Sequence, residues 1–240
     1  MIPTFILHRY PYRNTSWILE CLTATEGRIR AVAQSARGTT SRFRGQLEPF
    51  TPFHMLFSGK SELKTLKQAE LSDIPLSLNG EALWCGFYLN ELLLKLLPPE
   101  DPHPHLFTHY ANTLLMLTNT PIREIPLRQF EKILLETLGY APSFTHEANQ
   151  GPAIAAHLHY QYWPERGFIQ QAVSENASAI PGEILLQIAN NQFHEPAHFA
   201  LHKHILQSIL RPHLNRPLQT QQVFKPLLQV FRRVMPTVPR

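Results

Sequence analysis

The first 70 residues alternate between apolar and polar positions in short segments, and turn-forming residues separate these segments. β-branched and aromatic residues, which favour strands, dominate five of them. The pattern predicts strands at residues 4–7, 17–23, 27–36, 50–58 and 61–69. Five short strands with irregular loops indicate a small β-barrel, and the OB-fold is the common five-stranded form.

After Ile74 and Pro75 the apolar period changes from two to about 3.6, the spacing of one face of an α-helix. Pro98 and Pro99 should end the first helix, and Gly139 is a plausible residue to terminate the third. The predicted helices are 81–97, 105–117, 127–138, 182–191, 197–210 and 219–234.

Residues 157–162 and 167–169 alternate instead, which predicts a short hairpin inside the helical part. The expected fold class is therefore α+β, an N-terminal OB-fold barrel followed by a mainly α-helical domain. The domain boundary is expected near residues 72–80. This gives a nucleic-acid-binding domain at 1–75 and a helical domain at 76–240, with the hairpin-like insert near 141–170.

The charge is distributed unevenly around a net value of +4. Residues 1–67 hold ten Lys and Arg against four Glu, residues 68–195 hold five against fourteen acidic residues, and residues 196–240 hold seven and no acid. Basic ends beside an acidic middle suggest a polyanionic partner, although a solvated basic surface would look the same.

The basic residues of the predicted barrel are candidates for contacts with nucleic-acid phosphates. They are Arg28, Arg30, Arg37, Arg42, Arg44, Lys64 and Lys67. Phe5 and Phe43 lie among them and would either stack on bases or, as is more common for Phe, fill the barrel core.

No apolar run approaches the length of roughly 18 to 20 residues that spans a bilayer, so we expect no membrane contact. The N-terminus lacks the basic and apolar regions of a signal peptide. The two cysteines, Cys21 and Cys85, are too few for a disulfide framework. We therefore expect a cytoplasmic protein with reduced thiols.

One segment, His194 to His198, fits the zinc-binding pattern HExxH. Pro196 argues against it, because proline belongs in the first turn of a helix and His194 would then precede that helix. No acidic third ligand follows Glu195. His198, His202 and His204 form a loose cluster that is either a metal site or an exposed histidine-rich face.

Gly59-Lys60-Ser61 is similar to the end of a P-loop, but residue 54 is His where the motif needs Gly. We therefore expect no catalytic centre, no metal and no cofactor.

Several segments in the same order resemble the RecO family of bacterial recombination mediators. They include residues 5–9, 25–28, 41–45, 47–52, 62–66, 86–93, 127–131, 138–140 and 167–169. This family has an N-terminal OB-fold, a helical domain and, in some members, a zinc finger of four cysteines. Since no cysteine follows Cys85, the chain resembles the zinc-free branch.

The resemblance implies a protein that binds single- and double-stranded DNA and anneals complementary strands. It also implies docking on the acidic C-terminal tail of single-stranded DNA-binding protein and, with RecR, loading of RecA onto gapped DNA. Such a tail needs an apolar groove with a basic residue at its rim. Arg128, in the segment Leu-Arg-x-Phe-Glu, is the candidate basic residue, with Phe130 and Leu134 as groove walls or ordinary helix-core residues.

Three hypotheses stand at this point. The first is a DNA-binding repair mediator. The second is an RNA-binding OB-fold factor, and the third is a metal-dependent hydrolase that uses His194 and His198.

Overall fold

The computed structural model describes residues 1–148, 150–171 and 179–223. Contacts divide the chain into two compact units. Unit 1 is Met1–Pro121 together with the chain from Arg216 onward, and unit 2 is Ile122–Asn215. Among the described residues, no helix is both long and apolar enough to cross a membrane.

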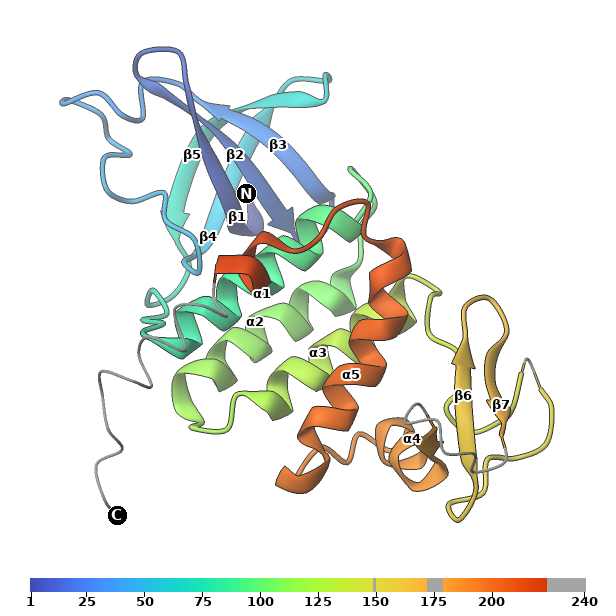
Figure 1. Cartoon of the computed structure of the whole chain (residues 1–240). Coiled ribbons are helices and arrows are strands. Elements are labelled where there is room, and N and C mark those ends of the chain that lie inside the picture. Colours follow the sequence, from blue (N-terminus) through green and yellow to red (C-terminus); the bar gives the residue numbers. More distant parts are fainter. Residues whose placement is uncertain (149, 172–178, 224–240) are drawn as a thin grey trace, which may run out of the picture. The chain divides into compact units, whose positions relative to one another are not determined.

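Unit 1 begins with a closed barrel whose strands follow one another in the order β1-β2-β3-β5-β4 (Figure 1). Only the pairing of β3 with β5 is parallel, and the other pairs are antiparallel. The strands are β1 (Ile2–Tyr12), β2 (Ser16–Thr23), β3 (Gly27–Ala33), β4 (Pro52–Ser58) and β5 (Leu63–Leu71). The predicted five-stranded, OB-like barrel is therefore confirmed.

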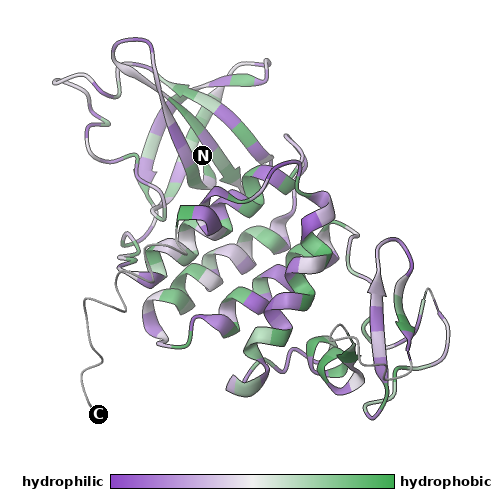
Figure 2. Ribbon diagram, viewed as in Figure 1, coloured by the Kyte–Doolittle hydropathy of each residue, from purple (hydrophilic) through white to green (hydrophobic). Residues whose placement is uncertain are grey.

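Alternate residues of these strands form the barrel core. The strands in Figure 2 accordingly show both hydrophobic and hydrophilic positions along their length. Ile6, Leu19 and Ile29 are at most 1% exposed there. Phe43 and Leu47, from the loop that joins β3 to β4, complete this core. Burial of apolar surface on this scale is the main stabilising contribution to such a small barrel.

A bulge in β1 changes which residues face outward halfway along the strand. The pairing register with β2 shifts between Ile6 and His8. The carbonyl of Leu7 at this bulge accepts a hydrogen bond of 2.8 Å from Nδ2 of Asn90, which itself accepts one of 2.5 Å from the hydroxyl of Tyr110. These buried contacts satisfy the polar groups that a bulge leaves unpaired.

Two helices, α1 (Glu81–Leu96) and α2 (Pro104–Asn119), complete the main body of unit 1. The ring of Phe5 in β1 packs on Phe107 and Tyr110 of α2. Gly86 allows α1 to approach the barrel closely, because a Cβ there would lie 2.8 Å from the ring of Phe50. As predicted, α1 ends just before Pro98 and Pro99.

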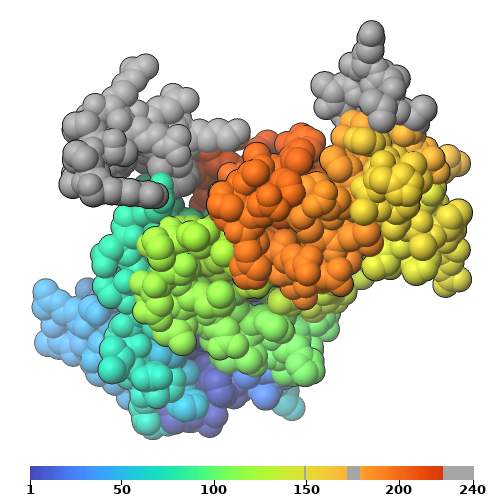
Figure 3. All heavy atoms as spheres, turned by 90° about the horizontal axis from the view of Figure 1, so that it is seen from below, coloured from blue at the N-terminus to red at the C-terminus, as the bar shows by residue number. Residues whose placement is uncertain are grey.

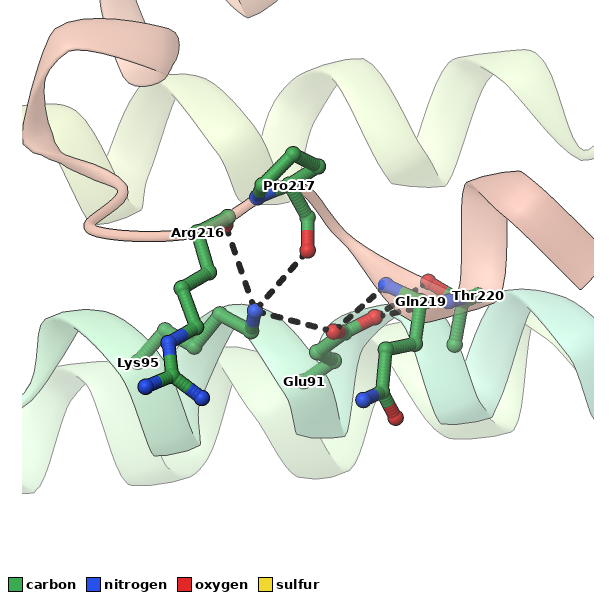
Figure 4. A network of polar contacts seen from close by, with 6 residues as sticks. All are labelled: Glu91, Lys95, Arg216, Pro217, Gln219 and Thr220. Carbon is green, nitrogen blue, oxygen red and sulfur yellow. Dashed lines mark hydrogen bonds and ion pairs between the residues drawn. The ribbon is translucent and has the colours of Figure 1, made fainter.

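The chain leaves unit 1 after residue 121 and returns to it at residue 216, where α1 holds it (Figure 4). Lys95 Nζ donates to the carbonyls of Arg216 and Pro217, at 3.3 and 3.0 Å. The Glu91 carboxylate accepts hydrogen bonds from the backbone N–H groups of Gln219 and Thr220, at 2.8 and 2.9 Å, and from the Thr220 hydroxyl. Glu91 thus satisfies N–H groups at the start of the helical turns at 219–223.

Unit 2 combines helices with a small sheet, and its yellow and orange segments lie side by side in the space-filling view (Figure 3). Its helices are α3 (Glu124–Thr137), α4 (Gly182–Ala189) and α5 (Phe199–Leu210), with short 3-10 turns η1 (Pro196–His198) and η2 (Arg211–His213). The sheet has the order β7-β6-β8, from β6 (His159–Trp163), β7 (Gly167–Gln170) and β8 (Ile180–Pro181).

Most predicted elements of the helical part are present. β6 and β7 form the predicted hairpin, and Gly139 follows α3 with a φ of 71°, as a helix terminator should. The predicted helix at 219–234 is helical at 219–223, and its remainder lies outside the described residues. Contacts group α1 and α2 with the barrel, whereas the division into 1–75 and 76–240 follows element type and stays a prediction.

Candidate nucleic-acid interface

Two of the seven basic barrel residues, Arg28 and Lys64, are mostly buried and form ion pairs within unit 1. The Arg28 side chain is 14% exposed, pairs with Glu20 at 2.9 Å and donates through Nε to the carbonyl of Leu97. The Lys64 side chain is 16% exposed and pairs with Glu100 at 3.0 Å. Both residues fasten β3 and β5 to the connection between α1 and α2.

Gly27 lets this connection lie against the barrel. Its φ is 69°, a conformation that favours glycine, and a Cβ there would lie 2.2 Å from the carbonyl oxygen of Asp101. Next to it, the N–H of Glu100 donates to the carbonyl of Arg28. The position of Arg28 is therefore fixed by backbone as well as by side-chain contacts.

Arg30 differs from Arg28, its neighbour on the same side of β3. Its guanidinium pairs with the other oxygen of Glu20 at 2.8 Å, yet the side chain is 50% exposed. Glu20 is thus neutralised by both arginines, and the group carries a net positive charge with one arginine open to solvent.

The loop between β3 and β4 brings three further arginines to the surface. Arg37 lies over the ring of Trp17 at 5.1 Å, and Arg42 lies over Phe43 at 4.7 Å. Arg42 also donates to the carbonyl of Lys67, and Arg44 donates to that of Thr39 at 3.3 Å. The loop residues Arg37, Arg42 and Arg44, together with Lys67 on β5, are all exposed.

A cavity of about 620 Å³ opens beside this region, between the β1–β2 turn, the end of β3 and the start of β5. Arg13, Asn14, Ser35 and Lys64 contribute to its wall. Cations and small polar groups of this kind suit phosphate oxygens. The structure therefore brings Arg13, which the sequence analysis did not single out, near the predicted residue Lys64.

The aromatic residues of the barrel are divided between the core and the surface. Phe5 and Phe43 are 4% and 6% exposed, so they are core residues, as Phe usually is. His8 and Tyr10, which the sequence analysis passed over, are exposed and lie with their ring centroids 4.3 Å apart. Aromatic residues at alternate positions of one strand were the signal that could have found them.

The residues predicted to bind a protein tail lie in the interior of unit 2. Arg128, Phe130 and Leu134 on α3 are at most 1% exposed. Arg128 Nη2 pairs with Glu131 at 2.8 Å, and its Nε lies 3.9 Å from Glu124. Among the described residues, the Nε and Nη1 of Arg128 have no hydrogen-bond partner, which is unusual for buried donors.

The histidines of the HExxH segment are not aligned for a metal. His194 is exposed and precedes η1, which begins at Pro196, as the position of the proline predicted. His198 and His202 each contact the same oxygen of Gln187, at 3.0 and 3.1 Å. Burial and the charges of His198 and Arg128 lower the pKa of His202 to about 4. Within the described parts of the chain, no three potential ligands gather around one point.

Comparison with known proteins finds related sequences over nearly the whole chain. The family model for the N terminal of recombination protein O matches residues 2–75, and the model for its C terminal matches residues 77–222. The chain belongs to the RecO family.

Individual RecO proteins are similar over most of their length. The DNA repair protein RecO of Coxiella burnetii is 43% identical, over 92% of this chain and 96% of its own. That of Pasteurella multocida is 40% identical, over 92% of both chains, and that of Burkholderia pseudomallei is 40% identical over 81% of its length. These matches support a role in DNA repair for the RecO fold described here.

Proposed function

We propose that this RecO-family chain binds single- and double-stranded DNA through its barrel and anneals complementary strands. In cooperation with RecR and single-stranded DNA-binding protein, it helps to load RecA onto gapped DNA. The observation that carries the proposal is the set of exposed arginines at 30–44 beside the polar cavity of the barrel. Annealing and loading need charge neutralisation and positioning, and neither step breaks a covalent bond.

The seven predicted contacts divide by role under this proposal. Arg30, Arg37, Arg42, Arg44 and Lys67 are exposed and contact phosphates directly. Arg28 and Lys64 act mainly by holding the barrel surface in place, because their charges are paired with Glu20 and Glu100. Since chromosomal DNA is the proposed substrate, we expect the protein in the cytoplasm, at the nucleoid.

The test is the salt dependence of binding to single-stranded DNA. The logarithm of the affinity should fall linearly with the logarithm of salt concentration, by about 0.7 for each phosphate contact. The double variant Arg42→Glu/Arg44→Glu should lose at least about tenfold in affinity and flatten this slope by about 1.4. The charge-matched control, Lys203→Glu/Arg211→Glu, changes exposed residues of unit 2 and should bind like the wild type.

Equal losses in both double variants would contradict a barrel site. Preference for structured RNA over DNA in competition would favour an RNA-binding factor instead. Strand annealing on DNA coated with single-stranded DNA-binding protein tests the mediator role directly, and an inactive wild type in that assay would contradict it.

We further propose that the acidic tail of single-stranded DNA-binding protein docks at α3, with Arg128 binding a carboxylate and Phe130 and Leu134 forming the apolar wall. The donors of Arg128 that lack a hydrogen-bond partner among the described residues support this proposal. Because Arg128 is 1% exposed, neighbouring side chains must shift to admit the peptide.

An acidic peptide with a hydrophobic C-terminus should bind the wild-type chain and bind Arg128→Met at least about tenfold more weakly. Arg166→Met, at an exposed arginine of the β6–β7 turn, serves as the control. Equal binding by all three proteins would remove Arg128 from the proposed site.

A further inference from the structure

The outer side of the barrel carries an uncovered aromatic pair directly after the bulge in β1. Before the bulge, Phe5 is buried against α2. After it, His8 and Tyr10 are exposed, and Tyr10 has 43% of its surface accessible. The two rings contact each other with an interplanar angle of 32°. An exposed pair of this kind on a strand is not needed for the core, which is complete without it.

The pairing of the strands shows which residues of β2, β3 and β5 lie on the same side of the sheet as His8 and Tyr10. One row runs from His8 through Glu20 and Arg30 to Leu63. The next row runs from Tyr10 through Ile18 and Val32 to Thr65. Paired residues in neighbouring strands point to the same side of a sheet, so these two rows form one surface.

This surface combines apolar and aromatic groups with a positive charge. Ile18 and Val32 are partly exposed, and Leu63 is 37% exposed. The only acidic side chain in the two rows, Glu20, is buried and paired with both Arg28 and Arg30. A ligand that touches the surface therefore meets flat or apolar groups and the guanidinium of Arg30.

We propose that this surface is a stacking platform for the unpaired bases of single-stranded DNA, with Arg30 contacting the adjacent phosphate. This inference rests on the proposed function and adds which feature of DNA is recognised. Bases have π-faces that stack on aromatic rings, whereas the bases of a duplex hide these faces from a protein. The excess of basic over acidic residues in the first 67 positions complements the backbone of the same ligand.

The platform and the arginine loop supply different parts of the binding free energy. The arginines of the loop at 37–44 neutralise phosphates, and this contribution does not depend on the base sequence or on exposed bases. His8 and Tyr10 contribute only where bases are unpaired, so they should favour gapped or unwound DNA over duplex. If this surface instead binds a protein partner, removal of His8 and Tyr10 should leave DNA binding unchanged.

The experiment compares binding to two labelled strands of about 15 nucleotides, a length that covers one OB-fold. One strand is oligo(dT), and the other is an abasic strand with the same phosphates. The proteins are the wild type, His8→Ala/Tyr10→Ala, Tyr10→Phe and the control Tyr140→Ala. Tyr140 is a suitable control because it is 37% exposed and stacks on His213 in unit 2.

The wild type and both Tyr10→Phe and Tyr140→Ala should bind oligo(dT) more tightly than the abasic strand. His8→Ala/Tyr10→Ala should lose about 5- to 150-fold on oligo(dT), the range for stacking of one base, and change little on the abasic strand. Unchanged binding to oligo(dT), or equal losses on both strands by a variant with the wild-type thermal midpoint, would overturn the platform.

If the double variant is poorly folded, Tyr10→Leu replaces it, because leucine keeps apolar bulk on the strand and lacks an aromatic face. Failure of the wild type to bind either strand would contradict the proposed function itself. Salt-dependent binding by the wild type with no effect of His8 and Tyr10 would contradict the platform alone.

Discussion

Two arginine networks, one in the barrel and one in α3, are each built on a buried glutamate and differ in how completely their charged groups are paired. In the barrel, Glu20 is paired through both oxygens, and Arg28 has a second partner in the carbonyl of Leu97. In α3, Arg128 pairs with Glu131, yet its Nε and Nη1 have no hydrogen-bond partner among the described residues. A fully paired buried network stabilises the fold, whereas unpaired buried donors are costly. At Arg128 these donors are the ones that the proposed acidic tail would satisfy.

Removal of Glu20, the central carboxylate of the barrel network, should have the largest effect on stability. Glu20→Ala should lower the free energy of unfolding by about 4 kcal/mol, because it leaves a mostly buried arginine without its counter-charge. Urea unfolding would measure the loss. Glu62→Ala, at an exposed carboxylate between β4 and β5, is the control, and similar stability in the two variants would contradict a structural role for Glu20.

Substitution of the two arginines of the barrel network should have different effects, on stability for Arg28 and on DNA binding for Arg30. Arg28→Met should cost about 3 kcal/mol, since it breaks a buried pair. Arg30→Met should cost less than about 1 kcal/mol, because its side chain is half exposed, and it should weaken binding to single-stranded DNA. The measurements are urea unfolding and DNA titration of both variants. A larger stability loss in Arg30→Met would reverse these assignments.

The positive charge of Arg128 also contributes to the low pKa of His202. Its pKa is lowered to about 4 by burial and then by the positive charges of His198 and Arg128. The unfolded chain therefore binds a proton near pH 6.5 that the folded chain takes up only near pH 4. The stability contributed by neutral His202 is complete above pH 6.5 and is lost as the pH falls through this window.

Relative to His202→Leu, the wild type should lose roughly 2 kcal/mol between about pH 7 and about pH 5. Urea unfolding at a series of pH values checks this. Arg128→Met should shrink the loss, because it removes a charge that opposes protonation. Parallel pH profiles for the wild type and His202→Leu would show that His202 does not carry the effect.

Glu91 extends the comparison to a carboxylate near the surface. Burial opposes its ionisation, but hydrogen bonds from Thr220 and Gln219 and from Lys95 outweigh burial and lower its pKa below 4.5. Its contribution is present above pH 4.5 and should be lost as the pH falls through the lower folded value. Glu91→Gln should cost about 1 kcal/mol at neutral pH, measured by thermal unfolding against the exposed control Glu81→Gln.

The elements of this fold were predictable because they depend on local patterns. The alternation of apolar residues predicted all five barrel strands, and the later period of about 3.6 predicted the first three helices. The bounds differ in places, since β1 extends over Ile2–Tyr12 where 4–7 was predicted, and α3 begins at Glu124 where 127 was predicted. The ends of α1 and α3 follow from Pro98 and from Gly139 in the same way. The candidate interface was predictable only as a charge-rich region, since the number of arginines on a strand does not show which of them are paired.

Residue order alone was enough to specify an OB-like barrel, a helical remainder, a basic N-terminal part and membership of the RecO family. The tertiary structure then determines which residues of the same type are buried and which are exposed. Arg28 and Arg30 are two positions apart on one strand. The connection between α1 and α2 covers Arg28, which donates to the carbonyl of Leu97, whereas Arg30 is half exposed. Likewise, α2 covers Phe5 before the bulge in β1, whereas Tyr10 after the bulge is exposed, because contacts between distant segments decide which side of a strand is covered.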